Sequence, residues 1–162
     1  MIEKVEYRPI GVIHSPFTEP RGTPIQSGVS MENEATAEIF EEFAEGLKDL
    51  EGFSHIILIF HFHRSRKAPL HQVPFMDDIE RGVFSIRSPS RPNPIGLSVV
   101  RLVSVEDNVI RFRGVDMLNG TPLLDIKPYV PEMDAHGAES TGWLEKRAGR
   151  MGRTRDDGRF GR

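Results

Sequence analysis

The chain has 162 residues, a net charge of −3 and no cysteine. This composition fits one domain with a core of its own, excludes disulfides and thiolate metal sites, and argues against a simple polycationic binder. Because the N-terminus lacks a signal-peptide core and the longest apolar run is residues 56–60, we expect a soluble cytoplasmic protein.

Short apolar runs separated by turn residues dominate the chain. Their β-branched and aromatic content, with Gly, Pro, Asn and Asp between them, is typical of a mainly β domain. We predict strands at residues 7–14, 36–40, 55–62, 82–87, 96–105, 109–115 and 122–126. Asp107-Asn108 and Asn119-Gly120 are expected to form hairpin turns. Seven short strands favour a closed or nearly closed β-barrel, since closure leaves no exposed sheet edge.

Two segments depart from the strand pattern. Phe40, Phe43, Leu47 and Leu50 fall at helical spacing, which predicts one short helix ending near residue 52. From position 143 onward, seven basic residues stand against three acidic ones. We therefore expect a barrel domain over residues 1–134 and a basic tail over 135–162 that is helical or partly disordered. Such a tail could hold a phosphate backbone or simply fray in solvent.

Three histidines lie in the segment HIILIFHFHR. His55, His61 and His63 are separated by even numbers, so a strand would place them on one face. His61 and His63 are close enough to share a metal ion, although a carboxylate would have to complete the site. The other interpretation is that one or two of these histidines line a pocket at the end of the strand and that His55 is structural.

Three further segments are candidates for binding. RSPSRPNPIG (87–96) is stiffened by three prolines and carries two arginines, which bind phosphate or carboxylate, or else merely decorate a rigid loop. PRGTPIQSG (20–28) has no strand or helix period and offers polar side chains. In GVDMLNGTPLLDIKPY (114–129), a carboxylate, an ammonium and a phenol alternate on one face, as a reactive set or as an ion-paired outer face.

Together these segments resemble the TrmO family, also called TsaA-like or VirR-like proteins. The matching stretches are IGVIHSPF, GTPIQSG, GLKDLEGFSHIILIFHFHR, GVFSIRSPSRPNPIGLSVVRL and GVDMLNGTPLLDIKPYVP. They follow one another in order over most of residues 10–131. The resemblance implies a β-barrel that binds S-adenosylmethionine without a doubly wound nucleotide-binding fold, a homodimer, and N6-methylation of threonylcarbamoyladenosine at position 37 of tRNA.

The resemblance also implies a set of site residues. The cofactor contacts would fall on Gln26, Ser27, Gly28, His63, Arg64, Arg87, Leu97, Asp116, Met117, Leu118 and Asn119. Arg91 and Lys127 would hold the substrate, and no metal is expected. For catalysis we assign Asp125 or Tyr129 as the acceptor of the N6 proton, and Asn93 as the group that orients the base.

Three alternatives remain open from the sequence. The chain could methylate another RNA or a small molecule, which its net charge suits. It could be a barrel that binds RNA without chemistry, although such modules usually display stacking aromatics. It could also be a metal-dependent barrel enzyme built on His61 and His63.

Overall fold

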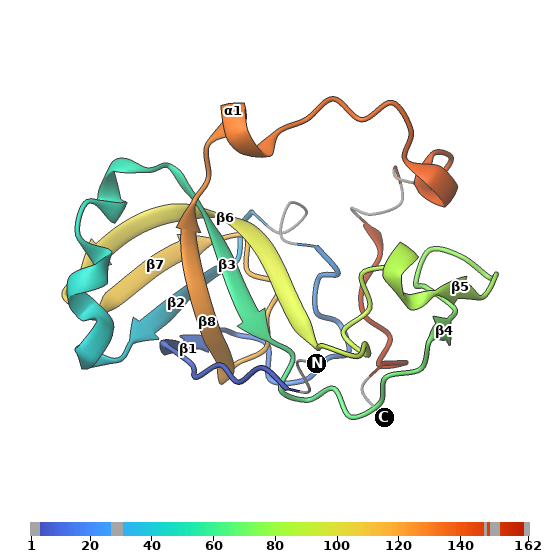
Figure 1. The fold of residues 1–162 in the computed structure, drawn as a ribbon, viewed down its shortest axis with the longest axis horizontal. Helices are drawn as coiled ribbons and strands as arrows, with labels where there is room; N and C mark the ends of the chain where they lie inside the picture. Colours follow the sequence, from blue (N-terminus) through green and yellow to red (C-terminus); the bar gives the residue numbers. More distant parts are fainter. Residues whose placement is uncertain (1–3, 27–30, 148, 150–152, 161–162) are drawn as a thin grey trace.

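The computed structural model describes residues 4–26, 31–147, 149 and 153–160. Six strands close an antiparallel barrel in the order β1-β2-β7-β6-β3-β8 (Figure 1). The strands are β1 (Gly11–His14), β2 (Glu34–Ile39), β3 (His55–His61), β6 (Ile95–Glu106), β7 (Val109–Arg113) and β8 (Thr121–Pro128). The predicted mainly β, closed-barrel class is confirmed. Among the described residues, no helix is long and apolar enough to cross a membrane.

Alternation along the strands builds the barrel's core. In β3 every second residue is buried, so Ile56, Leu58 and Phe60 point inward while Ile57 and Ile59 face out. The inward residues of the other strands join them, and Phe112 and Ile110 of β7 are fully buried. Gly11 allows β1 to approach β2, because a Cβ at this position would lie 2.3 Å from the Glu38 carbonyl oxygen.

Most predicted strands are confirmed, with shifted ends. β1 begins only at Gly11, after Pro9, which has no N–H to donate to a ladder. The Asp107-Asn108 hairpin is confirmed between β6 and β7, with Asp107 at φ 53°. Asn119-Gly120 does form a turn, but not a hairpin, since β8 pairs with β1 and β3 instead of β7.

One predicted strand is wrong, and the predicted helix is present in a different form. Over residues 82–87, only Gly82 belongs to a strand. This strand, Arg81–Gly82 (β5), pairs with β4 (His71–Gln72), after which the chain turns through the 3-10 segment Val83–Ser85 (η4). The Ser85 hydroxyl donates to the Gly82 carbonyl and favours this turn. The predicted helix is two 3-10 segments, Glu41–Leu47 (η2) and Leu50–Gly52 (η3), because left-handed Asp49 (φ 67°) separates them.

The chain after the barrel returns to the molecule. A short helix, α1 (Pro131–Asp134), follows β8, and an exposed stretch leads to the 3-10 turn Gly142–Leu144 (η5). Figure 1 shows this stretch arching from α1 over to the β4–β5 side, where the chain descends beside the loops. The predicted helical content of the tail is therefore restricted to short turns in the part described.

Candidate functional site: a pocket at the end of the barrel

A cavity of about 950 Å³ opens where the barrel meets the loops on its β4–β5 side. Three layers of chain line it: the barrel end, the loops over residues 20–26 and 62–93, and the C-terminal tail. Phe60, Gly96 and Ser98 contribute from β3 and β6. Gly96 lets the strand pass close to the Phe60 ring, which a Cβ would meet at 2.3 Å. The cavity lies within the size range of small-ligand sites, roughly 300–1,000 Å³.

The proline-rich loop is fixed by a buried hydrogen-bond network. The Ser88 hydroxyl donates to the Gln72 side-chain oxygen at 2.6 Å, and the Gln72 amide donates to the Ser90 and Pro69 carbonyls. All three side chains that face one another here, Gln72, Ser88 and Ser90, are buried. Because each buried polar group has a partner, the loop is held in one conformation at the cavity wall.

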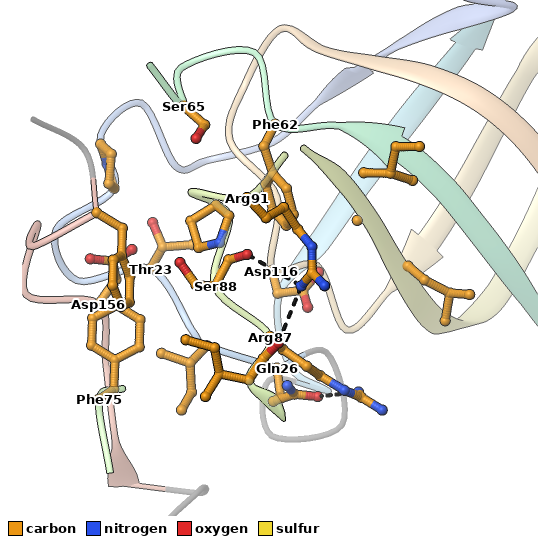
Figure 2. Close-up of a pocket in the computed structure, with 18 of the residues that line it drawn as sticks. Thr23, Gln26, Phe62, Ser65, Phe75, Arg87, Ser88, Arg91, Asp116 and Asp156 are labelled. Atoms are coloured by element: carbon orange, nitrogen blue, oxygen red, sulfur yellow. Dashed lines mark hydrogen bonds between the residues drawn. The ribbon is translucent and has the colours of Figure 1, made fainter. Parts of the chain in front are cut away.

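The two arginines of this loop are oriented differently. The Arg87 guanidinium donates to the Gln26 side-chain oxygen at 3.1 Å, which joins two of the predicted cofactor residues (Figure 2). Arg91 donates to the Ile86 carbonyl at 3.2 Å, so its guanidinium is partly used to brace its own loop. Both arginines line the cavity, as does Asn93.

A carboxylate lies on the barrel side of the cavity. Asp116 follows β7, and the hydroxyl of Ser98 lies 2.8 and 3.0 Å from its two oxygens. Met117 beside it is buried in the core, while the Leu118 carbonyl accepts from Thr121 at 2.7 Å. This turn is therefore rigid, and it presents the Asp116 carboxylate to hydrogen-bond donors in the cavity.

His63 also lines the cavity, just beyond the end of β3. Burial lowers the pKa of its imidazole, and the neighbouring charges of Arg64 and His61 lower it further. His55 lies at the other end of the strand, 2.9 Å from the Ser54 hydroxyl and edge-on to the Tyr129 ring. Within the described part of the chain, no three His, Cys, Asp or Glu side chains form a group that could hold a metal ion.

The cavity gathers most of the predicted site residues. Those that line it are Gln26, His63, Arg64, Arg87, Arg91, Asn93, Leu97, Asp116, Met117 and Leu118. Asn119 does not; its side-chain oxygen accepts from the Ser15 backbone amide at 3.2 Å and fixes the turn behind the wall. Ser27 and Gly28 lie outside the described residues.

Asp125, Lys127 and Tyr129 lie away from the cavity of their own chain. On the outer face of β8, Lys127 and Asp125 form an ion pair at 2.8 Å. That contact raises the pKa of Lys127 through the hydrogen bond and charge of Asp125. The spacing of these residues allowed either a reactive set or an ion-paired outer face. In the single chain, the structure shows the ion-paired outer face.

Several cavity residues were not identified from the sequence. Among them are Phe75, Trp143, Asp156 and Phe160, and also Thr23 and Ser88, which lie within the candidate binding segments 20–28 and 87–96. Thr23 and Asp156 are brought together from opposite ends of the chain, a contact that no local pattern encodes. The one available signal was Trp143, because a lone Trp in an otherwise polar tail is typical of a segment that packs against the protein.

A closed antiparallel barrel with a polar and aromatic pocket at one end defines this chain as a β-barrel ligand-binding protein. The family model for the tRNA-methyltransferase O N-terminal domain matches residues 12–135. The chain therefore belongs to the TrmO family, as its motifs predicted.

Individual relatives agree with this assignment. A probable S-adenosyl-L-methionine-binding protein of Pyrococcus abyssi is 58% identical over 154 residues, which cover 95% of this chain and 84% of that one. A human tRNA (adenine(37)-N6)-methyltransferase is 42% identical over 135 residues, covering 78% of this chain and 30% of that one. The crystal structure of TrmO from Pseudomonas aeruginosa superposes with a TM-score of 0.73 at 38% identity, over 86% of this chain and 62% of that one.

Proposed function

We propose that this protein is an S-adenosylmethionine-dependent methyltransferase that acts on N6 of an adenosine at position 37 of tRNA, with the threonylcarbamoyl-modified base as its acceptor. The observation that carries the proposal is the convergence of the family's cofactor positions on one cavity. Gln26, His63, Arg87 and Asp116 come from four separate segments and line the same space. The name of the human relative supports the activity, and the name of the Pyrococcus relative supports the cofactor.

The residues of the cavity suit this cofactor chemically. Phe60, Phe62 and Leu97 offer apolar surface for a purine, and the Asp116 carboxylate offers oxygens to hydroxyl or ammonium donors. Arg87 and Gln26, which also line the cavity, supply donors and an acceptor. When bound, S-adenosylmethionine supplies an already activated methyl group.

The work left to the protein is alignment and exclusion of water. The braced loop of Ser88 and Arg91 and the rigid turn at Asp116 hold their groups before the ligand binds, so little ordering is needed on binding. We propose that Asn93, which lines the cavity, orients the acceptor base. Arg91 would hold substrate phosphates, which predicts RNA binding that weakens with salt.

We further propose a homodimer, because it would bring Asp125 and Tyr129 to a cavity. In the strand register, Leu97 pairs with Ile59 and Ile59 pairs with Asp125, so these three residues form a row across the barrel's outer face. Leu97 is 58% exposed and lines the cavity, and Ile57 continues the apolar face. A second copy packed on this face would lie beside both the pocket and the Asp125–Lys127 pair, and the proton-accepting role of Asp125 or Tyr129 depends on it.

Calorimetric titration of the purified protein with S-adenosylmethionine, with ATP as control, tests the cofactor. We expect micromolar binding of the first ligand alone. Transfer of labelled methyl groups to tRNA, with and without the threonylcarbamoyl group, then tests the acceptor. Binding without transfer to either tRNA would point to a different acceptor. Absence of binding by a folded protein would leave an RNA-binding or metal-dependent barrel.

A further inference from the structure

The C-terminal tail forms part of the cavity wall. We call residues 142–147 and 153–160 the clasp. They follow the segment that the family model matches, which ends at residue 135. Trp143, Leu144, Asp156 and Phe160 of the clasp line the cavity together with barrel residues. The pocket of this protein is therefore built from more chain than the family domain alone.

The first half of the clasp is anchored on the β4–β5 loops. The Trp143 indole N–H donates to the Ser85 carbonyl at 2.8 Å, and the Arg81 guanidinium lies over its ring. Arg147 pairs with the buried carboxylate of Asp77 at 2.5 Å, and Arg81 pairs with the same carboxylate. Burial alone would raise the pKa of Asp77, but the hydrogen bonds from Arg81 and two backbone amides, with the charge of Arg147, hold it below its ordinary value.

The second half of the clasp is held mainly through its backbone. The Asp156 amide donates to the Thr23 carbonyl at 3.0 Å, and the Gly22 amide donates to the Asp156 carbonyl at 2.7 Å. Phe160 packs edge-on against Phe75, with ring centroids 4.8 Å apart. Because the two hydrogen bonds join backbone groups, they hold residue 156 next to the loop that carries Gln26, whichever side chain residue 156 has.

The Asp156 side chain is thereby directed to the cavity. One carboxylate oxygen accepts from the Gly158 amide at 2.6 Å; the other has no hydrogen-bond donor among the described residues. Burial raises the pKa of this carboxyl above its ordinary value. Figure 2 shows Asp156 beside Thr23, apart from Arg87 and Asp116. A half-buried acceptor oxygen gains most from an N–H donor supplied by a ligand.

We propose that Asp156 is a substrate-binding residue that accepts a hydrogen bond from an N–H group of the acceptor nucleoside, with Phe75 and Phe160 forming the apolar wall beside that base. The inference rests on the proposed function, since it divides the cavity between a cofactor on the Asp116 side and an acceptor on the clasp side. The proposed acceptor carries an N–H in its threonylcarbamoyl linkage besides the N–H at N6, and its base has apolar faces; both features match an acceptor carboxylate flanked by aromatic rings.

Asp156→Asn tests the proposal with little change in structure. The backbone hydrogen bonds to Gly22 and Thr23 remain, and the amide oxygen of Asn can still accept from Gly158. The second oxygen becomes an NH₂ group, which opposes an N–H donor. Asp157→Asn is the matched control, because Asp157 pairs with Arg159 in the same segment and does not line the cavity.

The assay measures the affinity for S-adenosylmethionine by calorimetry, and KM and kcat for modified tRNA by methyl transfer. For Asp156→Asn we expect an unchanged cofactor affinity and a KM for tRNA raised about tenfold or more, as for loss of a hydrogen bond to a charged group. Asp157→Asn should keep both values. Should Asp156→Asn not fold, Asp156→Glu retains the carboxylate, displaced by one methylene, and should raise KM severalfold.

Three results would overturn the assignment. A KM for Asp156→Asn equal to that of the wild type would show that Asp156 does not bind the acceptor nucleoside, while the methyltransferase proposal would stand. Loss of cofactor affinity would place Asp156 on the cofactor. A wild-type protein that binds S-adenosylmethionine but methylates no tRNA would refute the tRNA proposal, and the acceptor role with it.

Discussion

The buried imidazole of His63 makes the stability of the protein depend on pH. Its imidazole lies at the cavity wall, within 3.5 Å of the Thr121 hydroxyl, and burial lowers its pKa. In the unfolded chain it takes up a proton near pH 6.5. Below that pH the unfolded state binds more protons than the folded state, so stability falls as the solution is acidified.

We therefore expect the thermal unfolding midpoint to drop between pH 7.5 and pH 5.5, and to drop less in His63→Asn. His136→Asn serves as the control, because His136 is exposed on the stretch after α1. Circular dichroism melts at several pH values give the comparison. Parallel pH profiles for the wild type and His63→Asn would show that the imidazole is not held neutral by burial.

At this scale, the family resemblance singled out residues from separate segments, and the structure brings most of them to one cavity. Gln26 and Arg87 were predicted as members of one site, and the structure joins them by a hydrogen bond. The contact between Asp156 and Thr23 could not be predicted, because it depends on where the tail returns in space. Nor could the bracing of the proline-rich loop by Gln72, since a lone Gln in a polar segment carries no local signal.

Strand β1 offers a prediction at the scale of an element. Gly11 pairs with Ile39 of β2, and a Cβ on it would lie 2.3 Å from the Glu38 carbonyl oxygen. Gly11→Ala must push the two strands apart, so we expect a loss of about 1–3 kcal/mol in the free energy of unfolding, as for overpacked sites. Denaturant titration measures it.

Gly46→Ala is the matched control, because Gly46 has open space where the Cβ would go. It should leave the free energy of unfolding unchanged or slightly raised, since alanine reduces the entropy of the unfolded chain. Equal free energies of unfolding for Gly11→Ala and the wild type would mean that β1 and β2 can separate to admit the Cβ without loss of stability.

Elements were predictable where the local pattern and the tertiary structure agree. The run of β-branched and aromatic residues at 55–62 predicted a strand, and the structure shows one whose burial is strictly periodic. The segment 82–87 also has strand composition, but its Ser85–Gly82 hydrogen bond turns the chain. The apolar spacing over 40–50 correctly predicted a helical segment. It could not distinguish an α-helix from 3-10 turns, because both give similar spacing, and left-handed Asp49 divides the segment into two 3-10 turns.

At the scale of the whole molecule, the outer face of the barrel would determine, in the proposed dimer, whether Asp125 and Tyr129 reach a partner's pocket. Ile57 and Ile59 of β3 face outward between the exposed Leu97 of β6 and the Asp125–Lys127 pair of β8. Leu97 and Asp125 are two strand spacings apart, about 10 Å at the backbone. An apolar row that ends at a cavity on one side and at a carboxylate on the other is suited to contact with a second copy.

Ile59→Lys places a charge in the middle of this row. The carboxylate across from residue 59, Asp125, is already paired with Lys127. If the face is buried between two copies, the added ammonium therefore lacks a partner of its own, which costs about 3–5 kcal/mol. The dimer dissociation constant should then rise at least ~100-fold, at ~1.4 kcal/mol per factor of ten.

Val103→Lys is the control, since Val103 is 44% exposed on β6 outside this row. Sedimentation equilibrium measures both variants, and tRNA methylation should be lost only in Ile59→Lys because its Asp125 no longer meets a partner's pocket. A wild-type protein that is monomeric at micromolar concentration would remove the interface, and with it the assignment of Asp125 and Tyr129 as proton acceptors.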